Sequence, residues 1–212
     1  MNVVISARPT WGVALAHYLS SDCTERWQYL PRAEPSAPLA HAIIDAVQLP
    51  DAFRVLRQFA AQFPSTRVVA VFARPSDFVA SRARDAGCRA VLSDVDDLPS
   101  WLQILERLPS AEFQSGPSFA RAPRFCRLLT PRQAAVYDAV SRGLSDEQIA
   151  QAFGISIATA ETHRRDIQQK LGCHGHAEVV SHALRHGVVD VADLRTSVPV
   201  RQATRRHCAA GG

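Results

Sequence analysis

The sequence predicts a doubly wound α/β domain followed by an all-α domain of four helices. Residues 1–108 alternate short apolar segments with helix-like amphipathic segments. This alternation stops in residues 109–127, which contain three prolines. From residue 128 to residue 190 every segment has helical patterning. Strands that alternate with helices are typical of a parallel sheet covered on both faces, whereas purely helical patterning indicates a separate bundle.

The first domain is expected to contain five strands. We place them at residues 2–6, 27–30, 41–47, 67–72 and 89–92. Helices are expected at residues 10–20, 51–62, 75–86 and 98–108, whereas the second crossover, 31–40, is rich in proline and a poor helix former. Five such units correspond to a flavodoxin-like domain over residues 1–108.

Residues 109–127 are expected to be a linker, and residues 191–212 a disordered basic tail. The first 108 residues carry 11 arginines and 11 acidic residues, and residues 128–194 carry 6 basic and 8 acidic residues. The net charge of +4 therefore comes mainly from the linker and the tail. It does not by itself indicate a nucleic-acid partner.

Several classes of protein are excluded. The amino terminus lacks the basic start of a signal peptide, and no run approaches the roughly 20 apolar residues of a membrane span, so a cytoplasmic location without membrane contact is expected. The five cysteines form no C-x-x-C pair, which argues against disulfides and structural zinc. Because phosphate-binding, dinucleotide-binding and hydrolase motifs are absent, we expect no enzyme activity, cofactor or metal.

Capping chemistry places the four helices of the second domain, residues 128–190. Thr130 with Gln133, and Ser145 with Gln148, have the spacing of capping boxes. Ser156 can cap the third helix, and the last is expected over residues 177–186. Each helix is expected to end at a glycine, which adopts a positive φ easily: Gly143, Gly154, Gly172 and Gly187.

The second and third helices, joined by Gly154-Ile155-Ser156, form a helix-turn-helix. Ala160, Ile167 and Leu171 make an apolar stripe on the third helix. The outward residues are then Glu161, Thr162, Arg165, Asp166 and Gln169. Arginine and threonine on such a helix can reach base edges in the major groove, and the flanking Arg164 and Lys170 suit phosphates. The alternative is a helical bundle with a solvated polar face.

A family resemblance favours DNA binding. It rests on Leu129-Thr130-Pro131-Arg132-Gln133, Gly143-Leu144-Ser145, Ile149-Ala150, Gly154-Ile155-Ser156, Thr159, His163 and Lys170-Leu171-Gly172. Together these motifs resemble the LuxR/NarL-type DNA-binding domain, in one register without gaps over residues 128–189. The resemblance implies double-stranded DNA as partner, a homodimer formed through the last helix, groove readers at Glu161, Thr162 and Arg165, and a DNA contact at Thr159.

The chain departs from the family pattern on the same helix. Glu161 stands where lysine or another non-acidic residue is usual, while Ala135, Gln133 and Gln148 replace glutamates. Glu161 repels phosphate but can accept a hydrogen bond from cytosine N4. An unusual operator or a modest affinity is therefore expected.

The first domain resembles the receiver domain of response regulators, through Ile44-Asp45 to Leu49-Pro50 and through residues 86–93. Receiver chemistry needs Mg²⁺ held by clustered carboxylates. The resemblance places Ser6 and Ala7 where receivers carry an acidic pair after the first strand. It places Phe72 where they carry a hydroxyl residue at the end of the fourth strand, and Asp94 where they carry a lysine after the fifth. Asp45 is a candidate vestigial phosphoacceptor, although a register set by Pro50 puts Ala46 in that place.

The function expected is that of a transcriptional regulator, an atypical response regulator controlled without aspartyl phosphorylation. Its pseudo-receiver would be a dimerisation scaffold, a partner-binding surface or a sensor of a protein or small-molecule signal. The alternative is an interaction protein that sequesters another regulator by heterodimerisation. His182 and His186, one helical turn apart, could bind a metal from one helix face, but surface positions are expected for them.

Overall fold

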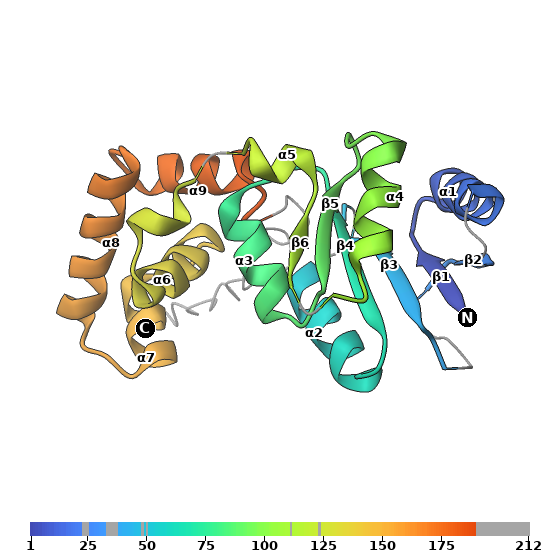
Figure 1. The fold of residues 1–212 in the computed structure, drawn as a ribbon. Coiled ribbons are helices and arrows are strands. Elements are labelled where there is room, and N and C mark those ends of the chain that lie inside the picture. The colour runs from blue at the N-terminus through green and yellow to red at the C-terminus, as the bar shows by residue number, and fades with distance from the viewer. Residues whose placement is uncertain are drawn as a thin grey trace, which may run out of the picture.

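The computed structural model describes residues 1–22, 26–32, 38–47, 49, 51–110, 112–122 and 124–189. The expected tail, 191–212, and residues 33–37 of the proline-rich crossover lie outside the described residues. The described residues form an α/β domain and an all-α domain that lie side by side (Figure 1). This is the predicted fold class.

The α/β domain contains a six-stranded sheet of order β2-β1-β3-β4-β5-β6, in which all neighbouring strands are parallel. The strands are β1 Asn2–Ile5, β2 Trp27–Leu30, β3 His41–Asp45, β4 Arg67–Phe72, β5 Ala90–Ser93 and β6 Gln114–Ser115. The five expected strands are all present. The sixth strand lies in the expected linker. It forms because the backbone N–H groups of Gln114 and Gly116 donate to the carbonyls of Arg89 and Val91, and it covers the edge of β5.

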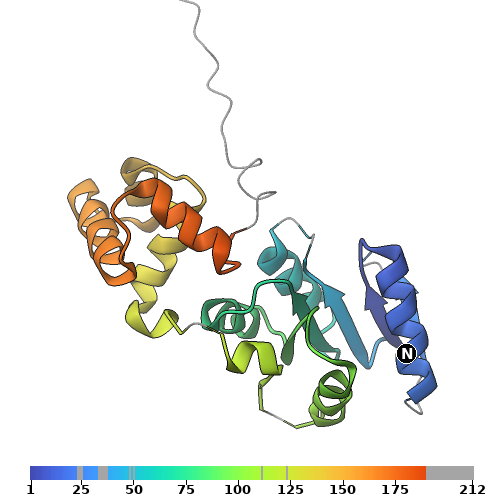
Figure 2. The ribbon, with the colours of Figure 1, turned by 90° about the horizontal axis from the view of Figure 1, so that it is seen from above.

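Helices cover both faces of this sheet (Figure 2). One face packs against α1 (Pro9–Asp22) and α4 (Leu98–Arg107), the other against α2 (Ala52–Gln62), α3 (Asp77–Asp85) and the short α5 (Pro117–Ala120). Successive strand residues alternate between the two cores: Val4 and Ile43 face α1 and α4, while Val3 and Ile44 face α2 and α3.

The all-α domain has the four expected helices: α6 Pro131–Ser141, α7 Asp146–Phe153, α8 Ile157–Leu171 and α9 His176–Arg185. A 3₁₀ turn, Cys126–Leu128, precedes them. Both predicted capping boxes form, on Thr130 and on Ser145. Gly154 and Gly172 end α7 and α8 with φ values of 63° and 66°, which a residue with a side chain adopts only with strain. Local capping thus sets the helix boundaries.

One hydrophobic core crosses from the first domain to the second. Phe78 on α3 lies with its ring 5.9 Å from that of Phe125 and 5.6 Å from that of Tyr137. Arg82 Nη1 pairs with Asp138 Oδ1 at 2.8 Å across the same boundary. In addition, two backbone carbonyls of the second domain, at residues 184 and 186, accept hydrogen bonds from side chains of the first. The domains are therefore packed together through α3, α6 and α9, rather than joined by a linker alone.

Candidate functional site

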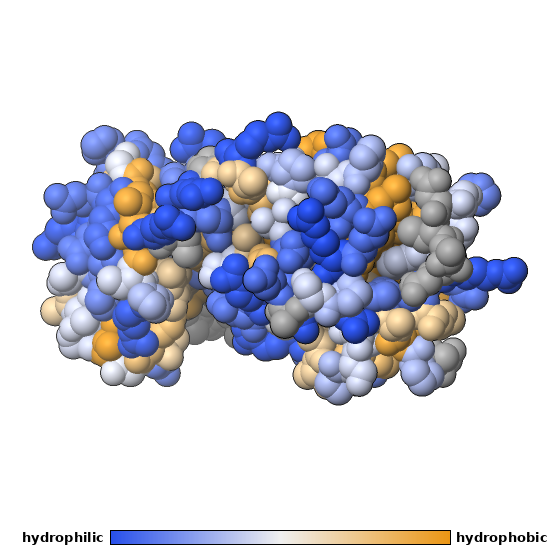
Figure 3. All heavy atoms as spheres, in the orientation of Figure 1, coloured by the Kyte–Doolittle hydropathy of each residue, from blue (hydrophilic) through white to orange (hydrophobic). Residues whose placement is uncertain are grey.

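Helix α8 presents most of its predicted DNA-contacting residues to solvent. Its buried stripe is as expected, since Ala160 and Ile167 are 0% and 1% exposed and Leu171 is partly buried. Thr159, Glu161, Thr162, Arg165 and Lys170 are exposed, whereas Arg164 is half-buried. The helix is therefore held by its apolar face and leaves a polar face open, and Figure 3 shows mainly hydrophilic residues at the end of the molecule where α8 lies.

Arg164 is engaged within the domain. Its Nε lies 2.9 Å from Asp146 Oδ1 and its Nη2 lies 2.8 Å from Asp146 Oδ2. These hydrogen bonds to Asp146 raise the pKa of the guanidinium, and the charge of Glu161 adds to the effect. The two-point contact ties α8 to the first turn of α7, so it holds the two helices of the helix-turn-helix at a set angle.

Lys170 is engaged in a similar way near the other end of α8. Its Nζ donates to Gln133 Oε1 at 2.7 Å, and Gln133 Nε2 donates to Asp166 Oδ2 at 3.3 Å. The same Gln133 oxygen accepts from the backbone N–H of Thr130. The sequence indicated Gln133 as half of a capping box and as part of the family motif, but its contact with α8 requires the packed helices.

Arg165 differs from these two cations. In the described part of the chain its guanidinium has no hydrogen-bond or ion-pair partner, although it is exposed on the open face of α8. The neighbouring hydroxyls are satisfied locally, since Thr162 Oγ1 donates to the carbonyl of Ala158 at 2.8 Å and Thr159 Oγ1 lies 2.8 Å from Ser156 Oγ. Arg165 therefore has all of its donors available to a ligand.

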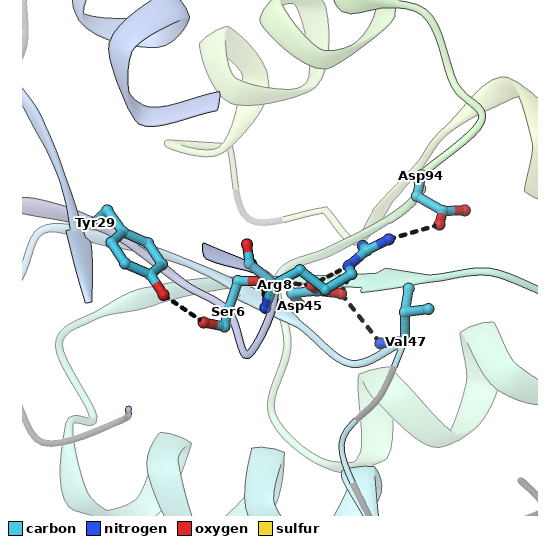
Figure 4. A network of polar contacts seen from close by, with 6 residues as sticks. All are labelled: Ser6, Arg8, Tyr29, Asp45, Val47 and Asp94. Atoms are coloured by element: carbon cyan, nitrogen blue, oxygen red, sulfur yellow. Dashed lines mark hydrogen bonds and ion pairs between the residues drawn. The ribbon is translucent and has the colours of Figure 1, made fainter. Parts of the chain in front are cut away.

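A second polar cluster lies at the carboxyl edge of the sheet, where receiver chemistry is expected. Ser6 and Arg8 follow β1, Asp45 ends β3 and Asp94 follows β5, so the parallel strands bring four distant residues together (Figure 4). Arg8 Nε and Nη2 bond the two carboxylate oxygens of Asp45 at 2.7 and 2.9 Å, and Arg8 Nη1 bonds Asp94 at 3.2 Å. One arginine bridges both carboxylates.

The Asp45 carboxylate is saturated by these and two further contacts. The Ser6 hydroxyl donates to Oδ2 at 2.6 Å and the backbone N–H of Val47 donates to Oδ1 at 3.1 Å. The Asp45 side chain is 1% exposed and that of Arg8 is 23% exposed. Burial lowers the pKa of Arg8, but hydrogen bonds and charge from Asp45 and Asp94 outweigh it, so the pKa is raised. The result is an ion-pair network in which both Asp45 oxygens are occupied and one guanidinium is shared between two carboxylates.

Arg8 is the residue at the centre of this cluster, and the sequence alone did not single it out. It stands directly after the residues aligned with the acidic pair, and its guanidinium also lies 4.6 Å from the ring centre of Trp11. At the hydroxyl position, Phe72 stacks on Phe53 with ring centres 5.5 Å apart. The available signal was an arginine and two aspartates, each at the end of a parallel strand, where side chains converge.

His182 and His186 lie at the domain interface, not on the open surface as expected. The rings are 4.4 Å apart, and each lies 5.0 Å from the ring of Phe125. His182 Nδ1 is 2.7 Å from the Tyr137 hydroxyl. No group of three or more metal-binding side chains occurs among the residues that the structure describes. The pair therefore packs as part of the interdomain core.

Acidification is expected to destabilise this interface. Burial, followed by the charges of His186 and Arg185, lowers the pKa of His182 from 6.5 to about 4, and burial also lowers that of His186, against the charge of Asp77. The unfolded chain binds more protons in this range, so the stabilising contribution is complete above pH 6.5 and is lost as pH falls through about 4.

Urea unfolding between about pH 7.5 and about pH 4.5 measures this loss. His182→Gln should flatten the pH dependence, whereas His176→Gln, a change at an exposed histidine, should leave it as in the wild type. If the free energy of unfolding of His182→Gln changes with pH as steeply as that of the wild type, other groups cause the loss.

The fold joins a receiver-like domain to a helix-turn-helix, and its sequence relatives make it a DNA-binding transcriptional regulator of the response-regulator type. Residues 127–183 match the family model of the luxR family of bacterial regulatory proteins. The transcriptional regulatory protein MctR of Rhizobium johnstonii is 31% identical over 153 residues, which cover 69% of this chain and 67% of MctR. The protein belongs to the LuxR family of bacterial regulatory proteins.

Two further proteins resemble nearly the whole chain. The response regulator Rre1 of Synechocystis is 25% identical over 201 residues, covering 81% of this chain and 86% of Rre1. The structure of RcsB from Salmonella enterica serovar Typhimurium, bound to promoter rprA with the phosphomimetic BeF3-, has a TM-score of 0.59 at 16% identity and covers 87% of this chain and 98% of RcsB. This likeness shows a shared two-domain fold. Of the helices described, none is long and apolar enough to cross a bilayer.

Proposed function

We propose that the protein regulates transcription in the cytoplasm as a homodimer that reads duplex DNA through α8, and that aspartyl phosphorylation does not control it. The single observation that carries the second part is the saturation of Asp45 by Arg8, Ser6 and Val47. The first part is supported by the open polar face of α8 and by membership of the LuxR family.

In this proposal Arg165 reads bases, because its donors are unoccupied and it projects from the exposed face of α8. Thr162 and Glu161 lie on the same face and contribute to base selection, and Thr159 contacts DNA near the start of the helix. Arg164 and Lys170 serve two roles. They hold α8 against α7 and α6, and their remaining N–H donors meet phosphates.

The receiver-like domain then acts without phosphotransfer. A phosphoryl group needs a carboxylate oxygen free to attack and a cation site whose carboxylates are available to Mg²⁺. Here a guanidinium occupies both Asp45 and Asp94, and Ser6 and Ala7 supply no carboxylate after β1. The domain is left as a scaffold or partner-binding surface, or as the sensor of another signal.

Incubation with acetyl phosphate and Mg²⁺ is expected to leave the intact mass of the protein unchanged. Both oxygens of Asp45 already accept strong hydrogen bonds, so attack on the donor would require breaking the buried pair with Arg8. Mass spectrometry at neutral pH, with an active receiver domain as positive control, measures the adduct. A phosphate adduct on Asp45 would overturn this part of the proposal.

On DNA the protein is expected to be a dimer, with contacts through α9. Two-fold operators are read by two-fold proteins, and the family resemblance assigns dimerisation to the last helix. Light scattering of the complex with a two-half-site duplex should give two chains per duplex. One chain per duplex at saturating protein would contradict the proposal.

A second candidate function is sequestration of another regulator by heterodimerisation. Exposed Glu161 on α8, together with the excess of acidic over basic residues in 128–194, favours it. A gel shift with the promoter region of the protein's own gene, in the presence of nonspecific competitor, distinguishes the two. A specific shifted band supports DNA reading. The absence of any band, together with a stable complex with a second LuxR-family chain, supports sequestration.

A further inference from the structure

A cavity of about 790 Å³ opens at the amino ends of β4 and β5, on the edge of the sheet opposite the Arg8–Asp45–Asp94 cluster. Three connections line it: the one from α2 to β4, the one from α3 to β5 and the one from α4 to β6. Volumes in this range suit small-molecule ligands.

The lining is strongly cationic. Arg67, Arg84 and Arg89 all line the cavity, and Glu112 is the one acidic residue among the lining residues. Within the described ranges, neither Arg67 nor Arg84 has an ion-pair partner. Bringing like charges together is unfavourable unless an anion neutralises them, and a cleft lined by one sign of charge concentrates the opposite ion.

The backbone holds these arginines on well-defined elements. Arg67 is the first residue of β4, and the N–H of Arg89 donates to the carbonyl of Val68 at 2.7 Å as β5 begins. The chain reaches Arg89 through Gly87, whose φ of 92° suits glycine. Parallel register therefore places the two connections side by side, with their arginines at one cavity.

The cavity also offers a flat apolar surface beside the charges. Phe113 forms part of the lining, and the guanidinium of Arg84 lies 4.5 Å from its ring centre. Among the described residues the N–H donors of Arg84 have no hydrogen-bond acceptor, so a second group can bond them while the cation–π contact is kept. The cavity thus combines hydrogen-bond donors for an anion with an aromatic face.

We propose that this cavity binds a small phosphate-bearing molecule of mononucleotide size. The arginines would hold the phosphate, because guanidinium groups match its oxygens with paired hydrogen bonds. The ring of Phe113, beside the guanidinium of Arg84, would contact the flat body of the ligand. Binding is noncovalent, since burial raises the pKa of the neighbouring Cys88 thiol to about 12 and keeps it protonated.

Isothermal titration of the full chain with AMP tests the proposal, with adenosine and inorganic phosphate as matched probes at constant ionic strength. AMP should bind at one site per chain, phosphate more weakly and adenosine at least tenfold more weakly than AMP. Arg67→Gln combined with Arg84→Gln should weaken AMP binding at least tenfold. Arg57→Gln, an exposed arginine on α2, and Arg165→Ala, on α8, should stay within twofold of the wild type.

Amide spectra locate the site independently of any variant that folds poorly. Addition of AMP should shift the amide signals of Gly87 and Thr66, and single Arg84→Gln, at an exposed position, should reduce that shift. No heat with AMP, equal binding of adenosine, or equal losses in Arg57→Gln or Arg165→Ala would overturn the proposal. DNA binding is measured separately, without nucleotide. A failure to bind AMP would therefore overturn this proposal and would not bear on the proposed function.

Discussion

Replacing Arg165 with alanine is expected to weaken binding to the specific operator roughly ten- to a hundredfold. The guanidinium is exposed on the open face of α8, where its donors are free, whereas Arg164 and Lys170 are tied to Asp146 and Gln133. A guanidinium that bonds guanine O6 and N7 together contributes about 1–3 kcal/mol of discrimination, so preference at one base pair per half-site should relax.

The measurement is a gel shift or fluorescence titration against the operator and against variants of each base pair. Lys170→Ala provides the contrast: it should weaken binding to all sequences alike and lower the salt slope by about one. Since Lys170 also bonds Gln133, the melting temperature of each variant is recorded alongside. If folded Arg165→Ala binds the operator as tightly as the wild type, α8 is not the reading helix and sequestration becomes the better interpretation.

Arg8→Ala is expected to lower the free energy of unfolding by about 3 kcal/mol, because it strands a buried carboxylate. The Asp45 side chain is 1% exposed and would keep only the contacts from Ser6 and Val47. Asp94 would also lose its bond from Arg8 Nη1. For a chain of this length a change of that size corresponds to a melting temperature lower by roughly 6–12 °C.

Two further variants separate this effect from a general loss of charge. Asp45→Asn in the Arg8→Ala background removes the stranded charge and should restore part of the stability. Arg54→Ala breaks the ion pair with Asp51, in which the Arg54 and Asp51 side chains are 65% and 38% exposed. This change should alter the free energy of unfolding by no more than about 0.5 kcal/mol. If Arg8→Ala is as mild as Arg54→Ala, the cluster does not hold the receiver-like domain together.

The helices of the DNA-binding domain could be predicted from the sequence because their causes are local. A capping box needs Thr130 and Gln133 three residues apart, and a helix end needs a glycine that tolerates a positive φ. Similarly, the buried stripe of α8 follows from the helical period alone. Such features depend on neighbours within one or two turns. Five strands of the first domain, β1 to β5, could likewise be predicted from short apolar runs.

Only the tertiary structure decided which distant residues meet. Arg8, Asp45 and Asp94 come from three strand ends, 37 and 86 residues apart from the first in sequence, so no local pattern pairs them. The sixth strand could not be predicted from the sequence, because its two residues lie among turn-forming residues and become a strand only by pairing with β5. The interdomain core likewise depends on α3 presenting Phe78 away from the sheet. In each case the contacts that stabilise the arrangement form between complementary surfaces, and these surfaces exist only after the elements have packed.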